Sequence, residues 1–256
     1  MTKYDYCIVG SGLFGSTFAY EATKRGYKCL VVEKRNHVGG NIYTEKKHNI
    51  DVHTYGAHIF HTNKKPIWDY VNTLTPFRNF INAPLANYEG KLYSLPFNMY
   101  TFKDLYGVTK PGEARRKIEE ETKPYQDLSP SNLEEKALSL VGPTLYNTLI
   151  KGYSEKQWGR NAKDIPAFVI TRLPLRFTYN NNYFTDYYQG IPKNGYTDLI
   201  RKMLENVTVE LNRDFLNHQA HYESLADKIL YTGNIDELFG CEEGNLEYRS
   251  LSFKHE

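Results

Sequence analysis

A glycine-rich turn near the N-terminus constrains this 256-residue chain more than any other feature. The residues Gly10-Ser11-Gly12-Leu13-Phe14-Gly15 form a G-x-G-x-x-G motif between an apolar run at 4–9 and a helical pattern at 13–25. A second apolar run, at 29–32, follows and ends at Glu33. This order predicts two parallel strands joined by a helix in a right-handed crossover.

The three glycines of the motif have different roles in a dinucleotide site. Gly10 permits the tight turn, Gly12 lets a pyrophosphate approach the backbone, and Gly15 allows the helix to pack closely on the strand. The N-terminus of the helix adds N–H donors and the positive end of its dipole. Glu33 lies 18 residues after Gly15, where a carboxylate accepts hydrogen bonds from an adenosine ribose. These residues predict dinucleotide binding rather than a purely structural turn.

A second glycine turn, Val38-Gly39-Gly40-Asn41, follows Glu33 by a few residues. Many FAD enzymes pass the chain over the diphosphate with such a turn, so the spacing favours FAD over NAD as the dinucleotide. An ordinary surface loop is the alternative interpretation of the same residues.

Composition and charge exclude several classes of protein. Lys and Arg number 32 against 30 Asp and Glu, which argues against binding to nucleic acid or to an anionic membrane through bulk charge. No apolar stretch approaches the ~18 residues that a membrane span needs, and the first residues lack the layout of a signal peptide. We therefore expect a cytoplasmic protein without membrane insertion.

The three cysteines, Cys7, Cys29 and Cys241, are odd in number and widely separated. We expect them to be small buried hydrophobic residues in a reducing compartment. Their spacing predicts neither disulfides nor a metal site.

The rest of the chain predicts an interrupted α/β fold. Helices are expected at 66–74, 111–122, 132–140, 143–158 and 196–205, with Ser131 as an N-cap. A hairpin is expected at 79–95, an antiparallel pair at 177–187, and strands at 207–212 and 228–232.

These elements predict a Rossmann-like FAD-binding domain with two insertions. The FAD-binding domain takes residues 1–78 and 207–256. A helical domain takes residues 100–165, and a small antiparallel sheet that forms the substrate region takes residues 79–99 and 166–206.

With these features in place, the sequence resembles the UDP-galactopyranose mutase family over nearly its whole length. The matching segments, in chain order, are YDYCIVGSGLFG, VEKRNHVGGNIYT, YGAHIFHT, LYSLPFN, KGYSEKQWG, TRLPLRFTYNNNYFTDYYQGIPKNGYT, YTGNIDELF and LEYRSLSF. The middle segments are not general motifs of flavoproteins, which makes the resemblance specific.

The resemblance implies an isomerase of galactofuranose glycan and cell wall biogenesis that interconverts UDP-galactopyranose and UDP-galactofuranose. In this family reduced FAD is the working cofactor, and its N5 forms an adduct with the sugar. The protein then supplies orientation and charge stabilisation. A homodimer is also implied by the family.

The resemblance also implies roles for individual residues. His58 and Arg172 are the expected catalytic residues, with His58 against the flavin and Arg172 on the substrate diphosphate. Substrate binding is expected from Asn82, Tyr153, Ser154, Trp158, Arg172, Tyr183 and Arg249. Cofactor binding is expected from Gly10, Gly12, Phe14, Gly15, Glu33, Lys34, Gly40, Asn41, His58, Ile59, Asp214 and Phe215, and no metal is expected.

Members of the family continue well beyond the LEYRSLSF motif. We therefore expect that the C-terminal portion of the family is missing here, and that this chain alone binds FAD weakly and turns over poorly. Two other functions share the N-terminal motifs. One is a flavin amine oxidase or desaturase, and the other is a non-catalytic fragment that binds FAD or UDP.

Overall fold

The structure, a computed structural model, describes residues 3–127, 129–170, 175–248 and 250–253. The chain divides into two compact units. Unit 1 contains Met1–Phe80 and Asp186–Glu256, and unit 2 contains Ile81–Thr185. The dinucleotide motif belongs to unit 1.

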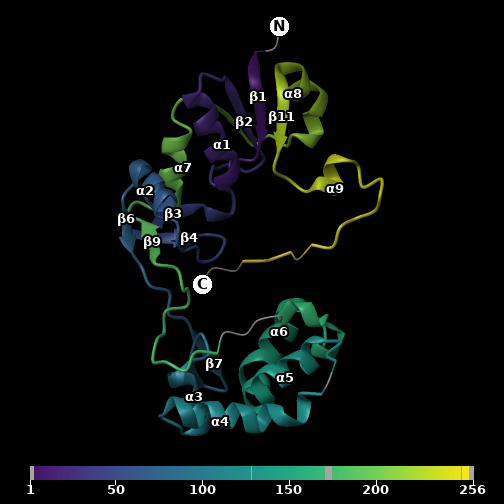
Figure 1. Cartoon of the computed structure of the whole chain (residues 1–256). Helices are drawn as coiled ribbons and strands as arrows, with labels where there is room; N and C mark the ends of the chain where they lie inside the picture. The colour runs from purple at the N-terminus through teal and green to yellow at the C-terminus, as the bar shows by residue number, and fades with distance from the viewer. Residues whose placement is uncertain (1–2, 128, 171–174, 249, 254–256) are drawn as a thin grey trace. The chain divides into compact units, whose positions relative to one another are not determined.

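A four-stranded parallel sheet forms the centre of unit 1. Its strands, in spatial order, are β10 (Thr208–Leu211), β2 (Cys29–Glu33), β1 (Tyr4–Val9) and β11 (Ala226–Tyr231). The central strands β1 and β2 contribute buried apolar residues to both faces because helices cover both. In Figure 1, α1 (Leu13–Lys24) and α8 (Gln219–Leu225) lie on opposite sides of the sheet.

Alternate strand residues enter the two cores of this sheet. Ile8 and Val31 pack with α1 and with α7 (Tyr196–Met203) on one face. Cys7 and Leu30 pack with Phe215 and Tyr222 on the other. Because side chains alternate along a strand, successive residues of β1 and β2 point toward opposite helical layers.

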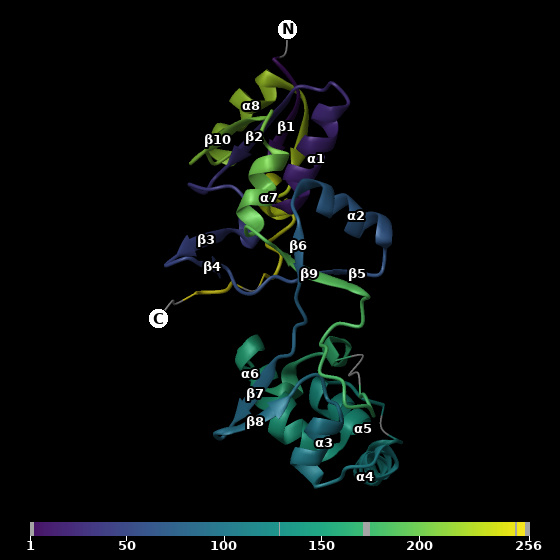
Figure 2. The ribbon, with the colours of Figure 1, turned by 90° about the vertical axis from the view of Figure 1, so that its left-hand side faces the viewer.

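The remaining strands of unit 1 are antiparallel (Figure 2). A hairpin is formed by β3 (Thr44–Lys47) and β4 (Ile50–His53). A three-stranded sheet has the order β5 (Phe60–Thr62), β9 (Tyr188–Pro192) and β6 (Phe77–Asn79), and Trp68 of α2 (Lys65–Leu74) packs on its aromatic residues. The short helix α9 (Ile235–Leu238) follows β11.

Unit 2 is mainly helical. It contains the hairpin β7 (Leu85–Tyr88) and β8 (Lys91–Ser94), then α3 (Met99–Tyr106), α4 (Pro111–Thr122), α5 (Leu133–Leu145) and α6 (Lys151–Trp158). A π-helical turn, Tyr146–Ile150, joins α5 to α6. The core of unit 2 is built from Phe102, Ala137, Leu145 and their apolar neighbours on these helices.

Most predicted elements are present, including the strand, helix and strand that flank the glycine motif. The antiparallel pair predicted at 177–187 is wrong, because the described structure has no strand there. The chain instead makes turns in which Asn and Arg side chains bond to the backbone. Alternating aromatic residues mimic a strand, but Asn180-Asn181-Asn182 favours such turns.

Two further features differ from the expectation, the N-cap of α5 and the extent of the substrate region. The N-cap of α5 is Asn132, whose side chain accepts the amide of Glu135, and not Ser131. By contrast, the break predicted between the helices at 132–140 and 143–158 is present at Gly142, whose backbone angles are not helical, directly before Pro143. Residues 186–206 fall in unit 1 rather than in a separate substrate region, because β9 pairs with β5 and β6 and α7 packs on the parallel sheet.

Candidate functional site

Neighbouring atoms leave no room for a side chain at two of the three glycines in the turn between β1 and α1, whereas the third glycine borders open space. Gly10 has φ +100°, and a Cβ there would lie 2.3 Å from the Oγ1 of Thr232. A Cβ on Gly15 would lie 2.1 Å from the carbonyl oxygen of Gly10. A Cβ on Gly12, by contrast, would meet nothing within 4 Å. Folding therefore requires Gly10 and Gly15, whereas Gly12 borders open space.

That open space lies at the N-terminus of α1. Gly12 is the N-cap and offers no side chain to cap the helix, and no acidic residue stands in the first turn. The first amides of a helix have no intrahelical acceptor, so they remain available to an anion. The geometry at Gly12 fits the phosphates of a dinucleotide.

Glu33 ties the end of β2 to this turn. Its carboxylate is only 5% exposed, and Oε2 accepts both the amide of Ser11 at 2.9 Å and its hydroxyl at 2.7 Å. Oε1 accepts the amide of Arg35 at 2.9 Å. Because a carboxylate has about four acceptor positions, Oε1 keeps one for a ribose hydroxyl.

A pocket of about 340 Å³ opens at this edge of the parallel sheet. It is bordered by the ends of β1, β2 and β11 and by the loop after β10. Eight of the twelve predicted cofactor residues line it: Gly10, Gly12, Glu33, Lys34, Gly40, Asn41, Asp214 and Phe215. Ligands of open α/β sheets bind at this carboxyl edge of the strands.

The second glycine turn packs directly on the first. The amide of Gly39 donates to the carbonyl of Ser11 at 3.0 Å. A Cβ on Gly40, where φ is +53°, would lie 3.0 Å from the Cα of Gly12. The two turns therefore form one wall of the pocket.

Arg35 also lines the pocket and was not predicted from the sequence. Its Nη2 donates to the Oδ1 of Asn41 at 2.9 Å, and its guanidinium stacks 4.5 Å over the ring of Tyr55. Nη1 is buried and has no hydrogen-bond partner among the residues that the structure describes. A buried donor without a partner fits an acceptor on a bound ligand. The position of Arg35, two residues after Glu33, could have identified it from the sequence.

Four other predicted cofactor residues do not line this pocket. Gly15 lies inside the turn, and Phe14 is largely exposed. His58 and Ile59 lie in the connection from β4 to β5. Phe215 lines the pocket but is 2% exposed, and its ring stacks on Tyr222, so it contributes mainly to the core.

The predicted substrate residues of unit 2 are brought together only in part. The amide of Tyr183 donates to the carbonyl of Asn82 at 2.8 Å. On α6, Tyr153 is 68% exposed while Ser154 is buried. Trp158 packs against the helical core. Trp158 follows Tyr153 by five positions, about 140° around the helix, so their side chains point in different directions.

Two predicted residues, Arg172 and Arg249, lie outside the residues that the structure describes. Among the described residues, Cys7 and Cys29 are buried as expected, whereas Cys241 is partly exposed. Burial raises the pKa of the Cys7 thiol to about 12, so this thiol stays protonated.

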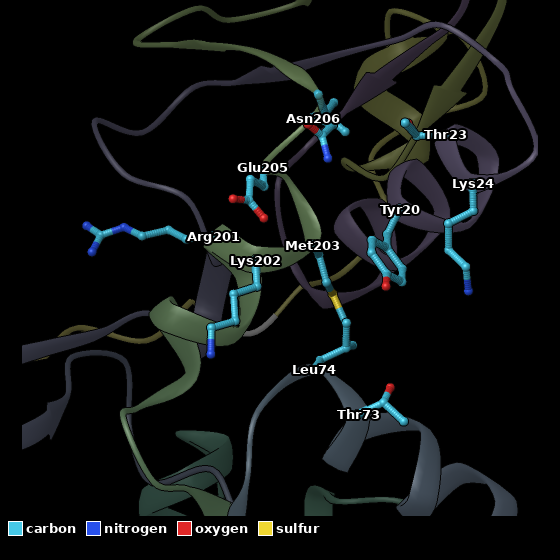
Figure 3. A pocket seen from close by; sticks show the side chains of 11 residues that line it. Tyr20, Thr23, Lys24, Thr73, Leu74, Arg201, Lys202, Met203, Glu205 and Asn206 are labelled. Atoms are coloured by element: carbon cyan, nitrogen blue, oxygen red, sulfur yellow. The ribbon is translucent and has the colours of Figure 1, made fainter.

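A larger pocket, of about 770 Å³, lies elsewhere in unit 1 between α1, α2 and α7. In Figure 3, Lys24 and Arg201 lie on opposite sides of Met203. Lys24 is paired with Glu21 at 3.1 Å and Lys202 with Asp198 at 3.3 Å. None of the predicted site residues that the structure describes lines this pocket, and its lysines already have partners.

Neither a metal cluster nor a membrane span is present in the described ranges of the chain. No group of three or more His, Cys, Asp or Glu side chains there is arranged to hold a metal ion. Within the same ranges, no helix is long and apolar enough to cross a membrane.

Family comparisons agree with this arrangement. A family model for NAD(P)-binding Rossmann-like domains matches residues 8–74, and one for UDP-galactopyranose mutase matches residues 148–256. The chain is 39% identical over 256 residues to a dTDP-fucopyranose mutase of Escherichia coli. It is 37% identical over 259 residues to a Klebsiella pneumoniae protein named "Probable UDP-galactopyranose mutase". The two alignments cover 96% and 99% of this chain.

The chain spans 66% of the Klebsiella protein and 67% of the Escherichia coli protein. Among solved structures, it is similar to reduced UDP-galactopyranose mutase, with a TM-score of 0.66 and 15% identity. That match covers 93% of this chain and 57% of the other. At this identity it shows a shared fold.

Proposed function

Because this chain belongs to the UDP-galactopyranose mutase family, we propose that it carries the FAD site and the substrate-binding helices of a nucleotide-sugar mutase. The proposed reaction interconverts the pyranose and furanose forms of a nucleotide-linked sugar. The observation that carries the proposal is the pocket at Gly12, where two glycine turns, a helix N-terminus and Glu33 meet.

The residues of this pocket fit FAD. The open space at Gly12 and the free amides of α1 suit a diphosphate, and Oε1 of Glu33 suits a ribose hydroxyl. The Nη1 of Arg35, which has no partner within the described part of the chain, supplies one further donor. When bound and reduced, FAD supplies the nucleophilic nitrogen that the sugar exchange needs.

The chain's own residues then bind and orient the two ligands. His58 would contact the flavin, and Arg172 would neutralise the diphosphate of the sugar nucleotide. The exposed ring of Tyr153 offers a flat apolar face to the base, and the Tyr183 hydroxyl binds the diphosphate. Asn82, Ser154, Trp158 and Arg249 complete the proposed substrate set.

UDP-galactopyranose is the proposed substrate. A dTDP-linked 6-deoxy sugar is the second candidate, because the 39%-identical relative carries the name dTDP-fucopyranose mutase. The two substrates share a nucleoside diphosphate on a hexose, so the same pocket chemistry serves both.

The decisive experiment incubates the protein with FAD and dithionite, and supplies UDP-galactofuranose or dTDP-fucofuranose in parallel. Chromatography of the nucleotide sugars follows formation of the pyranose. The His58→Ala variant should lose most of the turnover. The His48→Ala variant, changed at the exposed tip of the β3–β4 hairpin, should keep it.

The outcomes separate the alternatives. Pyranose formation from either furanose supports a mutase and identifies its nucleotide. Oxygen consumption with an amine or a saturated substrate would support an amine oxidase or desaturase instead. Retention of FAD or UDP without interconversion would support a binding fragment.

Two finer features are also proposed. The reaction consumes soluble sugar nucleotides, which suits a cytoplasmic location. A homodimer is proposed from the family resemblance, and light scattering of the purified protein tests it.

A further inference from the structure

A tight turn links β4 to β5 and contains His58. The amide of Gly56, where φ is +93°, donates to the carbonyl of His53 at 3.3 Å. The amide of His58 donates to the Nδ1 of His53 at 3.1 Å. The backbone and the side chain of His53 therefore both accept hydrogen bonds from the same turn.

These contacts define the tautomers of both histidines. A backbone amide only donates, so Nδ1 of His53 carries no proton and the neutral ring bears its proton on Nε2. The Nδ1 of His58 lies 2.8 Å from the carbonyl of Gly56, which only accepts. His58 therefore carries its proton on Nδ1, and its neutral ring presents Nε2 as an acceptor.

The surroundings of His53 favour the neutral ring. It is partly buried and packs edge-on against Tyr196 of α7, with ring centroids 5.6 Å apart. Burial lowers the pKa of His53 from its ordinary value of 6.5, and His58 and Arg78 of β6 lower it further. Asp51 of β4 acts in the opposite direction. The net effect keeps Nδ1 free to accept the His58 amide.

We propose that His53 is a positioning residue, whose unprotonated Nδ1 fixes the turn in which His58 presents Nε2 to the ligand. This inference rests on the proposed function, since His58 is there the flavin-facing residue. Protonated His53 bears a hydrogen on both ring nitrogens, so it cannot accept the His58 amide. Charging His53 therefore removes this hydrogen bond and loosens the turn at His58, although the bond from the Gly56 amide to the His53 carbonyl remains.

Two substitutions separate the hydrogen bond from the volume of the ring. In His53→Asn, Oδ1 takes the place of Nδ1 and remains an acceptor at every pH. In His53→Leu, an apolar side chain still packs on Tyr196 but accepts nothing. Thermal unfolding of both variants checks that the parallel sheet remains folded.

The first measurement uses the chain without added cofactor. Amide hydrogen exchange at His58 should be about fivefold faster in His53→Leu than in the wild type, and unchanged in His53→Asn. Long-range ¹H–¹⁵N spectra should show the His58 proton on Nδ1 in the wild type and in His53→Asn, and a mixture of tautomers in His53→Leu. Equal exchange in all three proteins would overturn the proposal.

The second measurement follows mutase turnover against pH with reduced FAD. His53→Leu should lower kcat more than it raises KM. Wild-type kcat should fall on acidification below about pH 6.5, and His53→Asn should lack that dependence. An acid limb shared by the wild type and His53→Asn would contradict the role of His53. Absence of turnover in all three proteins, with the expected exchange pattern, would argue against mutase turnover by this chain and would still support the His53–His58 contact.

Discussion

The carboxylate of Glu121 caps a helix at Thr144, 23 residues later in the chain. Its Oε2 accepts the amide of Thr144 at 3.0 Å, and its Oε1 accepts the hydroxyl at 2.7 Å. Gly142 breaks α5 immediately before, with φ +79° and ψ 171°, and Pro143 restarts the helix. The restarted segment continues through the π-helical turn into α6, which carries Tyr153. Glu121 of α4 thus caps the helical segment that leads to Tyr153.

Glu121→Ala should destabilise unit 2 by about 1–2 kcal/mol. The substitution removes both acceptors and leaves a helical amide without a partner. Urea unfolding followed by circular dichroism measures the change in the free energy of unfolding.

Glu120→Ala is the matched control. Glu120 is largely exposed, and its ion pair with Lys117 is long, at 3.7 Å. The control should therefore change the free energy of unfolding by less than about 0.5 kcal/mol. Equal effects of the two substitutions would argue against a cap at Thr144.

Gly142→Ala should lower the free energy of unfolding more than the replacement of an unconstrained glycine by alanine does. An added Cβ would lie 2.4 Å from the Cβ of Glu121, and a residue with a side chain is strained at φ +79°. We expect a loss of roughly 2–4 kcal/mol in the free energy of unfolding.

Gly112→Ala provides the opposite control for Gly142. Gly112 lies in the first turn of α4, and a Cβ there would meet nothing within 4 Å. This substitution should stabilise the protein by about 0.5–1 kcal/mol. Parallel urea titrations compare the two, and a Gly142→Ala variant as stable as the wild type would contradict the strain at the break.

Local patterns were sufficient to predict the part of the fold that surrounds the glycine motif. Gly10, Gly12 and Gly15 lie within one turn, and Glu33 ends the next strand, so their proximity follows from chain connectivity. The pocket residues near Gly40 and Asn41 follow for the same reason.

Long-range contacts were not predictable in this way. The cap of Thr144 by Glu121 depends on how two helices pack, and neither residue has a distinctive local pattern. Nothing in the local sequence distinguishes His53 from other histidines near strand ends. Its role depends on the turn that places the His58 amide at its Nδ1. The alternating residues at 177–187 predicted strands, but no neighbouring strand pairs with them in the part of the chain that the structure describes.

Gly12→Ala and Gly15→Ala should separate ligand binding from folding. Gly12 has extended backbone angles and open space at its Cβ position, so Ala fits without strain and fills part of the proposed phosphate site. We expect an unchanged melting temperature and an affinity for FAD that is lower by tenfold or more. Flavin fluorescence titration and thermal unfolding measure the two quantities.

The Gly15→Ala variant should instead lower the melting temperature, because its Cβ would lie 2.1 Å from the carbonyl oxygen of Gly10 and 3.2 Å from Ile8. Unchanged FAD affinity in a folded Gly12→Ala protein would show that the phosphates bind elsewhere.

The stability of unit 1 should depend on pH through His53. Because burial lowers its folded-state pKa below the ordinary 6.5, the unfolded chain binds more protons between these two values. The contribution of neutral His53 to the free energy of unfolding is therefore at its maximum above about pH 6.5. This contribution is lost as the pH decreases through the folded-state pKa of His53. Urea midpoints measured from pH 7.5 to pH 5 should fall more steeply for the wild type than for His53→Asn, which cannot be protonated there. If the two midpoints fall in parallel, His53 is not the group that couples protonation to the stability of this unit.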